Sequence, residues 1–483
     1  MRWIALISAL VWLATATSAH ALSVDEARHL VSRTGFGASV QEIEAMRPLD
    51  RAAAVDRLIA GLRSVPTVPP PAFVSGPRPD WPAFYRSRDE EVRRTFNRAR
   101  DAEAAQLKAW WLAEMAVTPS PLTERLVLFW HNHFTSSVDK VRHIDLLFRQ
   151  NQLFRSHAAG DVRALMHAIP IDAAMLRYLD GNTSRRGRPN ENFAREWFEL
   201  FTLGEGAYTE ADIKEAARAF TGWTIEEATG TPRLLRNQHD DGEKRLFGQI
   251  IPAGPDSQRV VVDLTLAQPA AARFLVGKLW REFVSPTPNP ATVERLATRL
   301  RQDWQLAPVL RALLLDPAFW AEETRGSLIK SPVDLIIGTI RSLELVTPDM
   351  AALVTVTRLL GQDLFNPPNV RGWPGHEAWI GTQTLLVRRD ALQRLARGEG
   401  VRGGGAGEAG MMAGGMMAAG AAPAAVASLR GRAVGVAGWL ALYPRLGEER
   451  AVLLAVPPVD RVETGDRLAR VERWMLDPAY HVK

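Results

Sequence analysis

Apolar residues at i, i+3, i+4 and i+7 recur along the chain, and Gly or Pro clusters separate the segments that carry them. This spacing places the apolar side chains on one face of a helix, so each helix needs a neighbour to cover that face. We therefore expect a mainly α, multi-helix globular body with long Pro/Gly-rich loops. The pattern predicts helices over residues 24–31, 89–117, 123–133, 190–203, 210–223, 270–283, 291–302, 308–314 and 333–345.

Strand signals are few. The best is the segment 258–264, because its Val260-Val261-Val262 core is β-branched. The segment 246–251 could pair with it across the turn at 252–255. The sequence therefore predicts one small β-hairpin in the helical body.

The N-terminus has the pattern of a secretory signal peptide. Arg2 precedes an apolar run over residues 3–14, and Ala19-His20-Ala21 is a small-residue cleavage pattern. We expect cleavage after Ala21 and a periplasmic or secreted protein. No later stretch reaches about 18 uninterrupted apolar residues, so we expect no transmembrane helix after signal cleavage.

Composition excludes several kinds of chemistry. The 483 residues include no cysteine, which rules out thiol catalysis, disulfides and Cys-ligated metals. Any metal must bind His, Asp, Glu or amide oxygens. The formal net charge is only +5, and basic residues are spread along the chain, so we expect no nucleic-acid partner.

Residues 400–427 differ from the rest, because Met411-Met412 and Met416-Met417 lie in a Gly/Ala background with almost no charge. Such a segment buries too little apolar surface to offset the entropy of ordering it, which predicts a disordered insertion. A Cu(I) site is the alternative, since thioethers suit that ion, but no His accompanies the methionines. The expected organisation is a signal peptide at 1–21, a main helical domain at 22–399, the insertion, and a C-terminal segment at 428–483 that packs back on the main domain.

His131 and His133 are candidate ligands of a divalent metal. Side chains two positions apart on a helix point about 200° apart, so the two imidazoles can share an ion only where the helix ends. Thr135-Ser136-Ser137 follows directly and favours such an end. The alternative is two histidines that are hydrogen-bonded inside a helix junction.

Glu196 and Glu199 are candidate catalytic residues. In a helix they share an arc of about 100° with Asn192 and Arg195, while apolar side chains cover the other side. In a cleft, this polar face could supply metal ligands or acid/base groups. The alternative is a solvated face with an Arg195–Glu199 pair.

Two further clusters are polar or aromatic. His239 opens the run His239-Asp240-Asp241-Gly242 and is the third candidate catalytic residue, although turn chemistry alone also explains Asp-Asp-Gly. The Pro/Gly-rich loop at 366–379 holds Trp373 and Trp379, which could stack on sugar rings or fill the core.

Taken in order, these segments resemble the successive landmarks of the bacterial domain-of-unknown-function 1800 family over nearly the whole mature chain. The resemblance implies a large, exported, mainly helical bacterial protein, and it supplies no catalytic residues. It also implies a partnership with a neighbouring exported family similar to sulfatases. His376 departs from the family pattern, in which we expect a second Gly after Pro374-Gly375, and Trp197 replaces a smaller aliphatic residue. The landmarks are Arg33-Thr34-Gly35-Phe36-Gly37, 129–134, 178–181, 190–199 with Gly204, Tyr208-Thr209-Glu210 with Asp212, 217–223, 239–248, Lys330-Ser331-Pro332 and 365–380.

Two functional hypotheses follow. In the first, His131 and His133 hold a divalent metal, Glu196, Glu199 and His239 serve it, and the protein hydrolyses an envelope or extracellular polysaccharide or ester. In the second, the protein is a noncatalytic binding or assembly factor for a sulfatase-like exported partner or a surface polymer. Ligand atoms that converge in an open pocket would favour the first hypothesis, and sealed, arginine-paired carboxylates the second.

Overall fold

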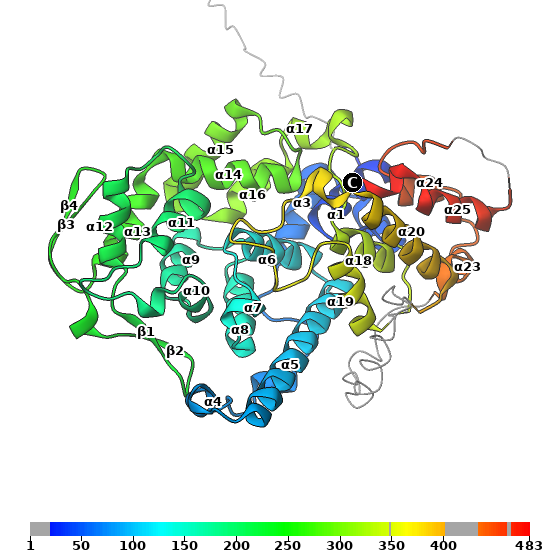
Figure 1. Cartoon of the computed structure of the whole chain (residues 1–483). Helices are drawn as coiled ribbons and strands as arrows, with labels where there is room; N and C mark the ends of the chain where they lie inside the picture. The colour runs from blue at the N-terminus through cyan, green and yellow to red at the C-terminus, as the bar shows by residue number, and fades with distance from the viewer. Residues whose placement is uncertain (1–19, 347–348, 401–432, 461–464) are drawn as a thin grey trace, which may run out of the picture.

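A computed structural model of the protein describes residues 20–346, 349–400, 433–460 and 465–483. The fold is mainly α-helical, as the apolar spacing predicts (Figure 1). Long α5 (Glu90–Val117) runs from a projecting tip into the body, α12 (Glu210–Ala219) lies towards one end, and α23 (Gly435–Leu442) lies towards the other.

The remaining helices of the first half of the chain are α1 (Val24–Thr34), α2 (Val40–Met46), α3 (Arg51–Ala60), α4 (Trp81–Arg86), α6 (Pro121–His133), α7 (Val138–Val141), α8 (Ile144–Ser156), α9 (Val162–Ala168), α10 (Ala173–Tyr178) and α11 (Glu191–Glu196). Those of the second half are α13 (Ser257–Ala267), α14 (Pro269–Phe283), α15 (Pro290–Asp303), α16 (Leu306–Leu314), α17 (Pro317–Trp320), α18 (Pro332–Ser342), α19 (Met350–Leu359), α20 (Thr382–Arg397), α24 (Glu449–Leu453) and α25 (Arg467–Leu476). Short 3₁₀ turns are η1 (Ala72–Val74), η2 (Ile169–Ile171), η3 (Gly181–Thr183), η5 (Arg236–Gln238), η6 (Glu322–Thr324), η7 (His376–Trp379) and η8 (Pro478–His481), and η4 (Trp197–Thr202) is a π-helix.

Local sequence explains where several helices begin. The hydroxyls of Ser23, Ser39, Thr209 and Ser331 each accept a backbone N–H of the first helical turn, and an acidic side chain three residues later reaches back to the cap. Each such capping box satisfies donors that a helix start leaves free. The cap at Ser331 matters most for the site described below, because its partner is Asp334.

The β structure is small, as predicted, but the hairpin pairs other segments than expected. Residues 258–264 do not form a strand but lie in α13, where Val261, Val262, Thr265 and Leu266 are buried at helical spacing. Packing against α12 and α14 therefore overrides the strand propensity of the valine run. Among the described residues, the strands form two antiparallel pairs, β1 (Trp223–Glu226) with β2 (Thr231–Leu234) and β3 (Lys244–Leu246) with β4 (Gln249–Ile251).

The predicted helix at 190–203 is also divided. It is α-helical in α11 and then widens into the π-helix η4, where Leu203 donates its backbone N–H to Phe198, five residues earlier. Such wide turns are rare and frequently lie at functional sites.

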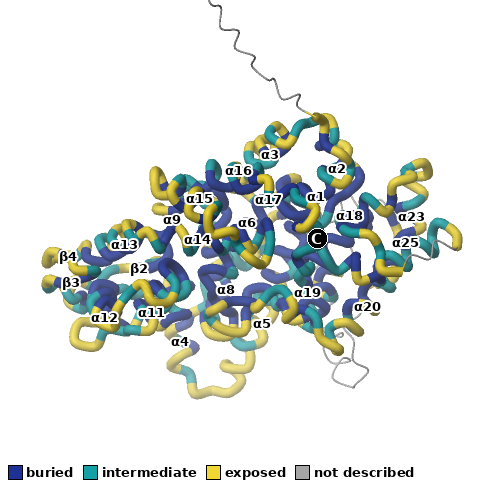
Figure 2. The backbone as a smooth tube through the Cα atoms, turned by 90° about the horizontal axis from the view of Figure 1, so that it is seen from above, coloured by how far each residue is buried: buried dark blue, intermediate teal, exposed yellow. Residues whose placement is uncertain are grey.

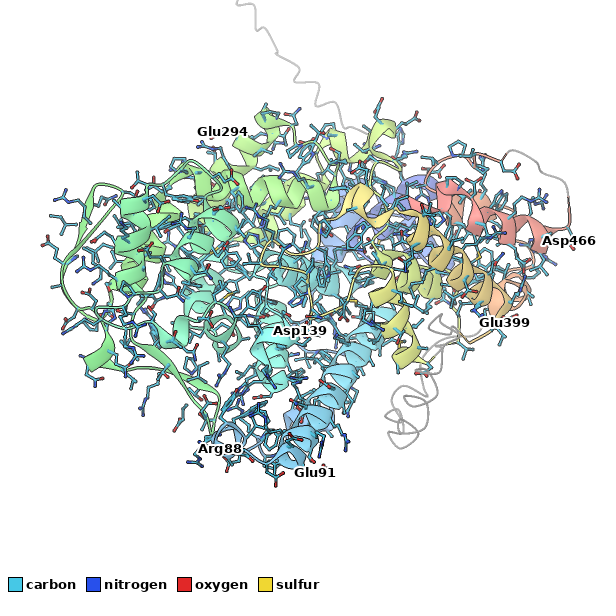
Figure 3. All side chains as sticks on the ribbon, viewed as in Figure 1. Arg88, Glu91, Asp139, Glu294, Glu399 and Asp466 are labelled. Carbon is cyan, nitrogen blue, oxygen red and sulfur yellow. The ribbon has the colours of Figure 1, made fainter. Side chains whose placement is uncertain are left out.

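The centre of the molecule is α6, which is buried continuously from Leu122 to His131. Figure 2 shows buried residues through the body, while the turns around α4 and the hairpin β3–β4 are exposed. The labelled charged side chains Arg88, Glu91, Glu294 and Asp466 lie at the periphery (Figure 3). Among the described residues, no single helix has the length and apolarity to cross a membrane, and the bent pair α13 and α14, at 71°, meets those criteria only jointly.

The C-terminal segment lies against the main body. Helix α24 contacts α1, and both α23 and α25 contact α20. Leu328 and Lys483 exchange two backbone hydrogen bonds, which hold the last residue beside the start of α18.

The insertion predicted at 400–427 lies outside the described residues, apart from Gly400. The segments that flank it are described, and they meet. A side chain at Gly398 would collide with Val434 and the backbone of Gly435, so the chain leaves and returns at one place.

Because its ends are already together, we expect the insertion to be dispensable for folding. Replacement of residues 401–430 by a short Gly/Ser linker should shift the melting temperature by only a few degrees, since the cost of closing a loop depends weakly on its length. Thermal denaturation of the two proteins checks this. A large loss of stability would mean that the segment packs on the body.

Candidate functional site

A cavity of about 340 Å³ lies between α6, α14, the start of α18 and the loop at 366–379, which we call the tryptophan loop. Its size is in the range of small-ligand sites. It is lined by Arg125, Leu128, Phe129, Asn132, His133, Lys278, Arg281, Glu282, Leu328, Ile329, Ser331, Asp334, Gln362, Arg371, Trp373, Pro374, Gly375, His376, Trp379 and Lys483.

One asparagine holds the tryptophan loop against α6. The Oδ1 atom of Asn132 accepts the backbone N–H of Trp373 at 2.8 Å. Gly372 has φ +87°, and a Cβ there would collide with Asn132, so this close approach requires glycine. The middle residue of the His-Asn-His sequence therefore positions one wall of the cavity.

A buried ion cluster forms part of the lining. The Asp334 carboxylate accepts hydrogen bonds from Arg125 and, at 2.8 Å, from the Nζ of Lys483. Burial alone would raise the pKa of Asp334, but Arg125 and Lys483 outweigh it and hold that pKa well below its usual range. The other acidic side chain of the cavity, Glu282, pairs with Arg125 at 3.3 Å. Both carboxylates are therefore already neutralised.

Lys278 and His133 connect the cavity to the π-helix η4. The Nε2–H of His133 donates to the carbonyl of Phe201 at 2.9 Å, and Lys278 donates to the carbonyl of Leu200 at 3.0 Å. These carbonyls lie in the last turn of η4, and the last carbonyls of a helix have no backbone N–H partner within the helix. The cavity side chains therefore cap η4, with a cation at its negative end.

The cations of the cavity outnumber its carboxylates, five side chains against two. Arg371 pairs with Glu199 at 2.9 Å on the rim. Arg281 makes no hydrogen bond or ion pair with any described residue. Trp373, Trp379 and Phe129 supply aromatic rings, so the cavity combines flat apolar surface with unneutralised positive charge.

The structure does not bring His131 and His133 together as metal ligands. The ring of His131 lies among aromatic residues, with centroids 5.1 Å from Phe365, 5.5 Å from Trp111 and 5.6 Å from Trp373. His133 has both ring nitrogens engaged, since its Nδ1 accepts from Lys278 at 3.0 Å. Among residues 20–346, 349–400, 433–460 and 465–483, no group of three or more His, Asp or Glu could hold a metal. His133 is thus hydrogen-bonded at the helix junction, whereas His131 is packed among rings and its buried Nε2 atom has no hydrogen-bond partner among the described residues.

The three candidate catalytic residues lie outside the cavity lining. Glu199 is held by Arg371 and by the Tyr208 hydroxyl at 3.4 Å, so it positions a rim residue. Glu196 is half-buried beside it, and burial together with Glu199 raises its pKa. His239 is buried, where its Nδ1–H donates to the Thr221 carbonyl at 2.8 Å and its Nε2 accepts from Ser257 at 3.3 Å. His239 therefore ties a turn to α13.

Comparison with known protein families gives one match. The model of a family described as a protein of unknown function (DUF1800) matches residues 29–469. The chain belongs to the DUF1800 family. No curated protein and no solved structure matches the chain.

The one cavity residue at which this DUF1800 chain departs from the expected pattern is His376. Its φ is +50°, a conformation that favours glycine, so the structure explains why a second Gly is expected here. The His376 side chain makes no hydrogen bond with a described residue.

The residues that sequence reasoning missed are Lys278, Arg281, Asp334 and Lys483. Lys278, Arg281 and Asp334 lie in predicted helices and Lys483 lies outside them, and no local motif marks the three cations. Asp334 alone had a local signal, the Ser331-x-x-Asp334 capping pattern, and that signal reports a helix start and not a site.

We expect His376→Gly to raise the free energy of unfolding by about 0.5–1 kcal/mol, because the relief of left-handed strain exceeds the added entropy of the unfolded chain. Chemical denaturation measures the change. His376→Ala is the matched control, because it keeps the Cβ at φ +50° and should not stabilise. Equal changes in the free energy of unfolding for the two variants would show that the backbone at His376 is not strained.

We also expect His131 to make the fold sensitive to acid. Burial lowers its pKa to about 3, so the folded state stays unprotonated while the unfolded state takes up a proton below about pH 6.5. Burial of His131 therefore does not reduce the free energy of unfolding above pH 6.5. Below that pH, the free energy of unfolding falls by about 1.4 kcal/mol per pH unit as the pH drops towards 3. His131→Phe should remove that part of the slope in denaturation curves measured between pH 6 and pH 4. If His131→Phe leaves the pH dependence of the free energy of unfolding unchanged, burial does not lower the pKa of His131.

Proposed function

We propose that this DUF1800 protein is exported and binds an acidic saccharide in the cavity. The observation that carries the proposal is the charge distribution of the lining, in which both carboxylates are paired while Arg281 has no hydrogen-bond or ion-pair partner among the described residues. Arg281 is an exposed residue at the aromatic-lined cavity, and its guanidinium can bind an oxyanion such as a planar carboxylate or a tetrahedral sulfate ester.

The rings of the cavity favour a sugar as the rest of the ligand. Trp379 and Trp373 are almost fully buried, at 5% and 6% exposure, so only limited ring surface faces the cavity. Phe129 lines the same space from α6. A sugar ring has one apolar face and polar edges, so it can pack on flat apolar surface and accept hydrogen bonds from the neighbouring charged donors.

Export is supported by Arg2, the apolar run at 3–14 and Ala19-His20-Ala21, although residues 1–19 lie outside the described part of the chain. A periplasmic or secreted protein meets envelope and extracellular polymers. Acidic saccharides are thus available where the protein would be located.

A metal-supported hydrolase is not the function that this geometry favours. A cavity with excess positive charge repels a divalent cation, and the nitrogens of His133 already have protein partners. The binding role in the second hypothesis, which needs no metal, agrees better with these contacts. The sulfatase-like partner implied by the resemblance would act on sulfated saccharides, which carry the charge that Arg281 favours.

The test is the affinity for acidic oligosaccharides. Arg281→Ala should weaken the binding of galacturonate or sulfated oligomers about tenfold or more, because a hydrogen bond to a charged group contributes about 1.5–3 kcal/mol. Titration calorimetry measures this, with neutral galactose oligomers as the ligand control. Arg301→Ala is the protein control, since Arg301 is exposed on α15 and loses the same charge. Wild-type protein that binds no acidic saccharide would refute the proposal.

A further inference from the structure

Lysine is rare in this protein, which makes a lysine in the cavity informative. Of the 59 basic residues only seven are lysine, and two of those seven, Lys278 and Lys483, line the cavity. Lys483 is bound to Asp334, whereas Lys278 makes no ion pair with a carboxylate in the described part of the chain. An arginine cannot release its proton in a protein, but a buried lysine can.

The hydrogen bonds around Lys278 assign its protons. The Phe201 carbonyl can only accept, so Nε2 of His133 carries the hydrogen and Nδ1 presents a lone pair. Lys278 must therefore donate one N–H to that lone pair, at 3.0 Å, and a second N–H to the Leu200 carbonyl, also at 3.0 Å. Two of the three positions on Nζ are committed to acceptors.

The third position on Nζ has no hydrogen-bond partner among the described residues. The ring of Phe274 lies nearby, with its centroid 4.7 Å from Nζ, and offers neither a strong donor nor a strong acceptor. This position holds a proton in the ammonium form and a lone pair in the amine form. Both forms keep the two fixed hydrogen bonds, so the proton can leave and return without movement of Lys278.

The same geometry argues against a covalent role for the amine. Formation of an imine leaves at most one N–H on the nitrogen, which would break at least one of the two hydrogen bonds. Proton exchange breaks neither. The surroundings of Lys278 therefore suit a general acid–base group rather than a nucleophile.

Arg281 lies three residues after Lys278 on α14. Side chains at this spacing share a helix face, with Cβ atoms about 5–6 Å apart. Both line the cavity. A carboxylate held by Arg281 would thus place its neighbouring carbon, the one bonded to the carboxylate carbon, within reach of Lys278.

We propose that Lys278 is the general base of a β-elimination, and that the ligand is a polymer that contains uronate residues. This inference rests on the proposed binding of an acidic saccharide. Lys278 removes the proton from the α-carbon of the uronate carboxylate, and Arg281 stabilises the charge that develops on that carboxylate. The electron pair of the broken C–H bond forms a double bond between the α- and β-carbons.

The bond from the β-carbon to the glycosidic oxygen then breaks, and that oxygen takes the proton that Lys278 carries. The products are a shortened saccharide and one with an unsaturated uronate end. The reaction consumes no water and requires no oxidant or metal. The amine is restored in each cycle.

The surroundings of Lys278 also set how turnover depends on pH. Burial, with Arg281 second, lowers the pKa of Lys278 to about 8. The amine is the active form of a base, so turnover should rise with pH up to about 8 and then level off.

The experiment incubates the mature protein with polygalacturonate and with alginate, and follows the ultraviolet absorbance of the conjugated product, confirmed by mass spectrometry. Lys278→Arg keeps the charge but not the base, so it should lower turnover about 10²–10⁴-fold and change affinity little. Lys214→Arg, on the exposed face of α12, is the control and should behave as wild type.

The outcomes separate the two proposals. Binding of uronate oligomers without unsaturated product at any pH from 7 to 10, or equal turnover of Lys278→Arg and wild type, overturns the role of Lys278 and leaves the binding proposal intact. Absence of binding refutes the binding proposal itself.

A second measurement on wild-type protein covers the case in which Lys278→Arg does not fold. Acylation of lysines by an amine reagent, mapped by mass spectrometry across pH, should give Lys278 a midpoint near pH 8, below the ordinary lysine value of about 10.4. Bound galacturonate oligomer should protect Lys278. A midpoint of Lys278 at the ordinary lysine value would overturn the inference.

Discussion

The buried ion cluster around Asp334 is the interaction on which the rest of the structure depends. Arg125 binds this carboxylate from α6 and also donates to the Gly35 carbonyl after α1, while Lys483 binds it from the last residue. Four segments far apart in the sequence thus meet at one carboxylate. Loss of one partner of a buried ion pair typically costs about 3–5 kcal/mol, because the remaining charge stays buried without compensation.

The same cluster sets the chemistry of the cavity. Asp334 and Glu282 are both bound by Arg125, so neither is available to attract a cation. The charge that remains belongs to Arg281 and Lys278, because Arg371 is paired with Glu199 on the rim. Packing and recognition are therefore coupled, because the ion pairs that join the helices also leave the adjoining cavity positive.

The sequence singled out segments that border the cavity, but at the central one it did not predict the contacts that the structure shows. His131-Asn132-His133 does lie beside the cavity, and each of the three residues has a defined contact. His131 packs among aromatic rings, Asn132 holds the tryptophan loop, and His133 fixes Lys278. Two histidines one residue apart suggest a metal because the pattern does not reveal the acceptors and donors that other segments bring to the ring nitrogens. In the same way, the valine run at 260–262 indicates a strand until α12 and α14 pack against it as a helix.

The sequence by itself determined the helical class, the approximate starts of the predicted helices, the family and the position of the tryptophan loop. These features depend on local spacing, capping residues and motifs, all of which act over a few neighbouring residues. Only the tertiary structure decided that α11 widens into the π-helix η4, that Asp334 is neutralised, and that Lys278 faces the same cavity as Arg281 and Trp379. The physical reason is that burial and pairing of charge depend on partners more than a hundred residues away, and no local pattern records which partners the fold will supply.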